Sequence, residues 1–174
     1  MRKQISSFRC AFRGIWNTVK SESHMRFHMV VGAYVLIFSL FYDFSPAQIA
    51  LLIFLIASVM AAEIINTCIE ELCNLTADRY EPLVKTAKDA AAGAVLVLSI
   101  AAVAVAVVFF FDIEVIIGIF KFFIANPVLI AVLVISAVVS ILFIWLGPVG
   151  LKEKLLRWKL KNKKQRDVAS KSSR

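Results

Sequence analysis

The chain has 174 residues, of which 60% are hydrophobic and 18% are charged, and its mean hydropathy is +0.82. A soluble domain is roughly 45–50% apolar and about a quarter charged, and a chain this short has too little interior to bury such an excess. The composition therefore excludes a water-soluble globule, a collagen-like chain and a disordered chain. It predicts an all-α integral membrane protein built as a bundle of transmembrane helices.

The first 28 residues predict an amphipathic helix that lies on the membrane surface. Their apolar side chains fall within about 100° of arc at 3.6 residues per turn; they are Ile5, Phe8, Phe12, Ile15, Trp16 and Val19. Basic side chains cluster along one edge of this arc. No long apolar segment follows Arg2 and Lys3, so we do not expect a cleavable signal peptide.

Four later segments are apolar enough to cross a membrane, which takes about 20 residues with roughly 17 to 25 tolerated. They are residues 29–42, 44–62, 90–111 and 127–146. The first is short unless Phe27, Arg26 and His28 extend it toward the headgroups. We therefore expect a surface helix (1–28), a three-span core (29–111), an additional C-terminal span (112–150) and a basic tail (151–174).

The basic residues orient these helices, because Lys and Arg accumulate on the cytoplasmic side of a membrane. Nineteen of the twenty lie before the first span, in the connection before the third span, or in the tail, and Lys121 is the exception. This pattern predicts a multi-pass protein of the inner (cytoplasmic) membrane with both termini in the cytoplasm. The net charge of +8 lies at the ends of spans, where anionic lipid attracts it, so no nucleic-acid partner is expected.

An acidic face continues from the second span. Glu63, Asn66 and Glu70 occupy positions i, i+3 and i+7, so a helix places them within roughly 60° of one another. Carboxylates at a membrane boundary are costly, and they indicate a functional site by default. The alternative is that these acids pair with Lys or Arg from a neighbouring helix. Two acids and an amide on one face favour a cation site over a single salt bridge.

Further charged residues are expected on the same side of the membrane. Glu22 ends the surface helix and can supply another acid by folding back, while Lys88 and Asp89 open the third span. Mg²⁺ usually takes one or two carboxylates and completes its shell with water and nucleotide phosphates. Together these residue types indicate a phosphoryl-transfer site, where positioning and charge neutralisation provide most of the catalysis.

These residues resemble a family of small bacterial membrane lipid kinases, the diacylglycerol kinases and undecaprenol kinases. The resemblance covers residues 1 to about 111. It rests on Glu22 with the following HMRFH, on Glu63-x-x-Asn66-Thr67-x-x-Glu70, and on Ala87-Lys88-Asp89 followed by AAAGAV. It implies a homotrimer whose active sites are shared between neighbouring protomers.

The resemblance also implies a role for each matching residue. Glu63 matches the catalytic base, which takes the proton of the lipid hydroxyl as that hydroxyl attacks the γ-phosphate of ATP. Asn66 matches the residue that helps to orient the acceptor. Glu22 and Glu70 match the carboxylates that hold Mg²⁺ with the nucleotide phosphates. The other residues expected at ATP are Arg79, Tyr80, Glu81, Lys88 and Asp89, and those expected at lipid and phosphate are Arg9, Arg13 and Arg26.

The sequence departs from the family pattern at three places. Cys10 stands where an aromatic residue is common near the nucleotide, and Asn74 replaces an Asp often found after the second metal-binding Glu. The segment from about Pro127 onward lies beyond the three-span unit of the family. We interpret this extension as an added anchor; the alternative is a remnant or mimic of a fused domain.

We therefore expect an ATP- and Mg²⁺-dependent lipid kinase whose acceptor is undecaprenol or diacylglycerol. The segments SESHMRFH and NTCIEELC look more like the undecaprenol kinases. One alternative is a cation transporter that uses Glu63 and Glu70, which predicts acids near the bilayer midplane. Glu63 instead falls near the cytoplasmic end of its span. A catalytically silent scaffold is disfavoured because the motif acids and Lys88 are all present.

Overall fold

A computed structural model describes residues 2–76 and 82–172 of the chain, and those residues are almost entirely helical. The helices are α1 (Arg2–Ser21), α2 (Ser23–Phe38), the 3₁₀ turn η1 (Ser39–Phe41), α3 (Pro46–Thr76), α4 (Pro82–Phe110), α5 (Ile113–Ala125) and α6 (Pro127–Ser172). Three of them start with proline, which suits a first helical turn because the backbone N–H that proline lacks would have no helical partner there. The expectation of an all-α membrane protein is confirmed.

Four segments are long and apolar enough to span a membrane: Ser23–Phe41, Pro46–Leu75, Pro82–Phe110 and Pro127–Pro148. The sequence had placed the start of the first span at Met29. Helix α2 begins six residues earlier, because the break that ends the surface helix falls at Glu22, whose backbone is extended. Arg26 and His28 therefore lie in the first turns of the span instead of in the surface helix.

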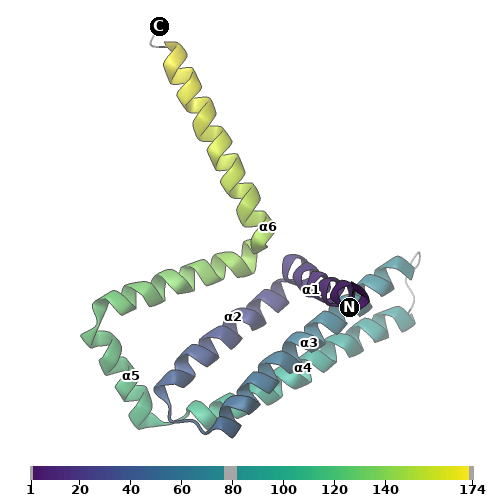
Figure 1. Ribbon diagram of the computed structural model, residues 1–174, viewed down its shortest axis with the longest axis vertical. Helices are drawn as coiled ribbons and strands as arrows, with labels where there is room; N and C mark the ends of the chain where they lie inside the picture. Colours follow the sequence, from purple (N-terminus) through teal and green to yellow (C-terminus); the bar gives the residue numbers. More distant parts are fainter. Residues whose placement is uncertain (1, 77–81, 173–174) are drawn as a thin grey trace.

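Helices α2, α3 and α4 run side by side, and α1 crosses the end at which α2 begins (Figure 1). Gly32 of α2 allows a close approach to α3, since a Cβ at this position would lie 2.8 Å from Cγ2 of Ile56. Several of the most buried side chains, including the fully buried Met25, lie where α1, α2 and α3 meet, among them Thr18, Val19, Arg26 and Glu63. The rest of each span exposes its apolar side chains, as expected for a surface that faces lipid.

Aromatic side chains close the opposite end of the bundle. Tyr42 stacks near Phe44 and Phe110, and its hydroxyl donates a hydrogen bond of 2.9 Å to the carbonyl oxygen of Phe110. Burial, followed by the nearby charge of Asp112, raises the pKa of Tyr42, so the hydroxyl remains a donor. These contacts join the turn after α2 to the end of α4.

The segment between the third and fourth spans contains helix α5, which the sequence analysis treated as a connection. Asp112 caps this helix, because Oδ1 accepts from the backbone N–H groups of Glu114 and Val115 at 3.0 and 3.2 Å. The rings of Phe122 and Phe123 pack against Phe41 of η1. An aspartate before an apolar run was the sequence signal for this helix.

Helix α6 returns along α2 and bends where it passes α1 (Figure 1). The bend lies at Gly147, whose φ of 62° and ψ of 173° leave the helical region, and Pro148 follows it. Within the span, the hydroxyl of Tyr34 on α2 lies 2.8 Å from Oγ of Ser136 and 3.4 Å from Oγ of Ser140. The fourth span is therefore docked on α2 by polar contacts as well as by apolar packing.

Candidate active site

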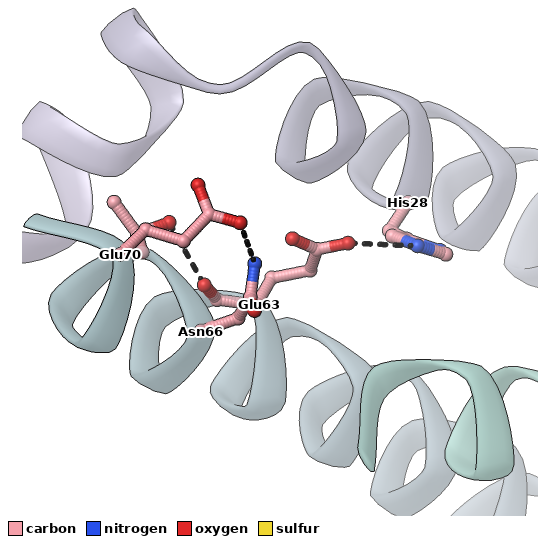
Figure 2. Close-up of polar contacts among 5 residues, drawn as sticks. His28, Glu63, Asn66 and Glu70 are labelled. Carbon is pink, nitrogen blue, oxygen red and sulfur yellow. Dashed lines mark hydrogen bonds and ion pairs between the residues drawn. The ribbon is translucent and has the colours of Figure 1, made fainter. Parts of the chain in front are cut away.

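The acidic face predicted from the sequence lies on α3 and faces the start of α2. Glu63 is buried, with 4% of its surface exposed, while Asn66 and Glu70 are half-buried. The hydroxyl of Thr67 donates to the carbonyl oxygen of Glu63 at 2.9 Å, so this residue keeps its polar group within its own helix. Figure 2 shows the polar side chains of α3 on the side that faces α2, beside His28. The 3.6-residue spacing therefore brings Glu63, Asn66 and Glu70 together as expected.

Asn66 and Glu70 form a hydrogen-bonded pair that does not use the amide oxygen of Asn66. The amide nitrogen of Asn66 donates to Oε1 of Glu70 at 3.1 Å, which fixes the orientation of the amide (Figure 2). Its oxygen, Oδ1, is buried and has no hydrogen-bond partner among the described residues. A buried acceptor without a partner is costly, and it marks a place where a ligand donor or a cation would fit.

His28 is a site residue to which the sequence analysis gave no role of its own. Its Nε2 lies 3.3 Å from Oε1 of Glu63, and the Glu63 carboxylate points toward the imidazole ring (Figure 2). The ring of Phe27 packs edge-on against the imidazole with centroids 5.5 Å apart. The signal in the sequence was a histidine in the first turns of an apolar span, but its partner on α3 depended on how two helices pack.

Glu22 forms the elbow between α1 and α2. Its backbone is extended, with φ of −101° and ψ of 122°, and its side chain is half-buried. The charges of Glu22 and Glu70 both act on the Glu63 carboxylate, so the three acids belong to one electrostatic neighbourhood. Glu22 thus lies where α2 begins, the end of α2 that faces the acidic face, and its part in the site stays a prediction.

Lys88 reaches the same face from α4. Its Nζ donates a hydrogen bond of 2.6 Å to Oδ1 of Asn74, which lies one helical turn beyond Glu70 on α3. The partner is a neutral amide and not one of the carboxylates of the acidic face. Asp89, the next residue, is exposed.

The arginines expected at lipid and phosphate differ in their surroundings. Arg9 and Arg13 are exposed on α1, as a contact with headgroups requires. Arg26 is buried, with 5% of its surface exposed, and its guanidinium donates to three backbone carbonyls. These contacts give Arg26 a structural role, and they lend no support to a substrate contact. The expected ATP residues Arg79, Tyr80 and Glu81 lie outside the described residues.

An apolar cavity of about 240 Å³ opens beside His28 and extends along the spans. Residues of α2, α3 and α4 line it, among them Phe27, Leu52, Ile56 and Ala102. We call this cavity the span groove. His28, the partner of Glu63, is one of the residues that line this cavity, while the other walls are almost wholly apolar. Such a lining suits a hydrocarbon chain whose polar end lies near His28.

The described residues contain no group of three His, Cys, Asp or Glu side chains placed to hold a metal ion alone. The acidic face instead offers the carboxylates of Glu63 and Glu70 and the Asn66 amide oxygen, which has no hydrogen-bond partner among the described residues. That donor set fits Mg²⁺, which usually binds one or two protein carboxylates and takes its remaining ligands from water and phosphate.

Comparison with known proteins places this site in a family. The chain is 37% identical over 100 residues to the undecaprenol kinase of Bacillus subtilis, covering 58% of this chain and 81% of that protein. It is 36% identical over 96 residues to the diacylglycerol kinase of a Synechocystis species, covering 55% of each chain. No solved structure matches it significantly.

The model of the prokaryotic diacylglycerol kinase family matches residues 9–110, which include α1 from Arg9 onward, the acidic face and the first three spans. The match leaves out α5 and α6. The expected resemblance is thus confirmed, and the chain is a multi-pass membrane protein and a lipid kinase, a phosphotransferase acting on an alcohol. This chain belongs to the prokaryotic diacylglycerol kinase family.

Proposed function

We propose that this lipid kinase transfers the γ-phosphate of ATP to the hydroxyl of undecaprenol at the cytoplasmic face of the membrane. The observation that carries this proposal is the buried carboxylate of Glu63, which lies 3.3 Å from Nε2 of His28, a residue that lines the span groove. A lipid in the groove would present its hydroxyl to Glu63, and a nucleotide on the acidic face would present its phosphate from the other side.

The proposed reaction uses Glu63 as the general base. Glu63 takes the proton of the lipid hydroxyl, the hydroxyl oxygen forms a bond to the γ-phosphorus, and the bond to the β-phosphate oxygen breaks to release ADP. His28, 3.3 Å from Glu63, holds the carboxylate toward the groove. Oδ1 of Asn66, which lacks a partner, would accept a hydrogen bond and so orient the reacting groups.

Glu22 and Glu70 are the residues that we propose hold Mg²⁺ together with the ATP phosphates. When bound, the ion neutralises phosphate charge and holds the transferred group in line. Lys88 and Asp89 would contact the nucleotide from α4, and Arg79, Tyr80 and Glu81 from the connection before it. Arg9 and Arg13 would contact lipid headgroups and phosphate from α1, where both are exposed.

Undecaprenol is the proposed acceptor because of both sequence and shape. The relative named undecaprenol kinase matches over 81% of its own length, whereas the relative named diacylglycerol kinase matches over 55%. The span groove is lined almost wholly by apolar side chains, which suits the hydrocarbon part of an isoprenoid alcohol. Diacylglycerol is the second candidate, and its product would be phosphatidic acid.

We further propose that both termini lie in the cytoplasm of a bacterium and that the protein is a homotrimer. Helix α1 and the bend of α6 lie at one end of the bundle, opposite η1 and α5 (Figure 1). The segments that hold nineteen of the twenty basic residues adjoin that end, which the positive-inside rule assigns to the cytoplasm. Native mass spectrometry from detergent tests the trimer, and a monomeric mass would contradict it.

Phosphate transfer by the purified protein is the direct test. Radiolabelled γ-phosphate is offered with Mg²⁺ and with either undecaprenol or diacylglycerol, and the lipid products are separated. We expect the rate for undecaprenol to exceed that for diacylglycerol, and the reverse order would reassign the substrate. Glu63→Gln should lower kcat by roughly 10²- to 10⁴-fold while ATP still binds, as expected for loss of a general base. Unchanged turnover would remove Glu63 from that role.

A further inference from the structure

The C-terminal span lies outside the family match, yet it contacts the core beside the acidic face. The contact is made by Arg26, whose Nη1 donates to the carbonyl oxygens of Val19 and Lys20 at 2.9 and 3.0 Å. Its Nε donates to the carbonyl oxygen of Ile144 on α6 at 3.0 Å. One guanidinium therefore joins the last turn of α1 to the fourth span.

The carbonyl oxygen of Ile144 can accept the bond from Arg26 because of the residue that lies four positions later. In a continuous helix it would accept from the N–H four residues later, but that residue is Pro148, which has no N–H. Carbonyls at the last turn of α1 also lack intrahelical partners and carry negative partial charge. A buried arginine with a planar fork of donors satisfies both sets at once.

Gly147 completes this arrangement. Its φ of 62° lies in the left-handed region, which favours glycine, and a Cβ there would lie 3.2 Å from Cζ and Nη1 of Arg26. The bend of α6 and the position of the Arg26 side chain therefore depend on each other.

Arg26 also spans the elbow that places two site residues. Glu22 lies at the break between α1 and α2, and Arg26, one turn later, binds back across the break to α1. His28, two residues further along α2, contacts Glu63. A change in the angle between α1 and α2 would thus move Glu22 relative to the acidic face of α3.

We propose that the fourth span is a positioning element of the kinase site, which it reaches through Arg26. Through this contact, the fourth span fixes the angle between α1 and α2 and thereby the position of Glu22 relative to Glu63 and Glu70. This inference rests on the proposed active site, and it assigns to Arg26, Gly147 and Pro148 a role beyond anchoring.

The test compares two glycines of the same helix in the full-length protein. Gly147→Ala introduces a Cβ against Arg26, whereas Gly150→Ala places its Cβ at an ordinary 3.6 Å from Leu146, so it is the matched control. We expect Gly147→Ala to lower kcat roughly tenfold or more, since small misplacements of site residues are costly, and Gly150→Ala to keep the wild-type rate. Arg26→Lys, which keeps the charge but loses the fork of donors, should lower kcat similarly.

A distance measurement separates positioning from general damage. Cys10 of α1 and Cys68 of α3 are exposed native thiols and can carry spin labels. The labels are introduced in a Cys73→Ala background, so that only these two thiols react. Labelled chains are diluted with unlabelled chains, so that the measured distance lies within one chain. Gly147→Ala and Arg26→Lys should broaden or shift the Cys10–Cys68 distance distribution, while Gly150→Ala should leave it unchanged. Wild-type kcat or an unchanged distribution in both of the first two variants would overturn the proposal. This readout needs no turnover, so it remains decisive even if the proposed substrates fail.

Discussion

His28 on α2 and Glu63 on α3 meet through Nε2 and Oε1 atoms 3.3 Å apart. The contact lies at the end of the span groove, so it ties the first span to the buried carboxylate where a lipid hydroxyl would arrive. It also explains how a carboxylate with 4% of its surface exposed has a polar partner at the edge of the membrane.

Removing His28 should lower the rate more than the affinity for ATP. In His28→Leu we expect kcat to fall roughly tenfold, because the base loses the group that orients it, while the KM for ATP stays unchanged. His28→Gln keeps a donor nitrogen at similar reach and should retain more activity than His28→Leu. Steady-state kinetics in detergent checks both, and equal losses in the two variants would contradict the orienting role.

Two neighbouring acids on α3 provide a matched test of the metal proposal. Glu70→Gln should raise the Mg²⁺ concentration needed for half-maximal activity by roughly tenfold or more, since a carboxylate ligand is lost. Glu71→Gln removes the same charge from the next residue, which is exposed on another side of the helix, and should leave the Mg²⁺ dependence unchanged. Similar Mg²⁺ curves for both variants would exclude Glu70 as a ligand.

Substitutions of Lys88 and of Asn74 should raise the KM for ATP to different degrees. Lys88→Met would remove the proposed phosphate contact, which is worth about 1.5–3 kcal/mol for a charged hydrogen bond, so the KM for ATP should rise roughly tenfold to hundredfold. Asn74→Ala removes only the partner that holds Nζ at 2.6 Å, and its effect on the KM for ATP should be smaller. Titration of ATP at fixed lipid measures both. A larger effect from Asn74→Ala would mean that Asn74 itself contacts the nucleotide.

The span groove can be narrowed without touching the acidic face. Ala102 of α4 lines the groove, and Ala102→Leu should raise the KM for the lipid roughly fivefold or more, which corresponds to about 1 kcal/mol of lost apolar binding. The KM for ATP should not change. Ala101→Leu, at the adjacent exposed position, adds the same bulk outside the groove and is the control. Equal lipid KM values for both variants would place the lipid elsewhere.

Much of this architecture follows from local sequence patterns. The four spans follow from the length of the apolar runs, and the shared face of Glu63, Asn66 and Glu70 follows from their spacing on a helix. Helix α5 was missed because a short apolar run with one lysine, between two spans, looks like a connection. Its aspartate cap was the only local indication.

Contacts between residues far apart in the chain could not be predicted from such local patterns. The partner of His28 and the three carbonyls bound by Arg26 come from other helices, up to 118 positions away in the chain. Their identity depends on how α1, α2, α3 and α6 pack, and no local periodicity encodes such pairings. For the same reason Arg26 was expected at lipid and phosphate, because an arginine beside a surface helix has no visible partner in the sequence.

The carboxylates at the mouth of the span groove bear on what happens after transfer. In the proposed reaction, a neutral alcohol would occupy the apolar span groove beside His28, whereas the phosphorylated lipid would carry new negative charge near Glu63 and Glu70. After release of ADP and the metal ion, these like charges would repel the product toward the headgroup layer. In the proposed reaction, the acids that activate the alcohol and bind the metal would therefore also speed the release of the phosphorylated product.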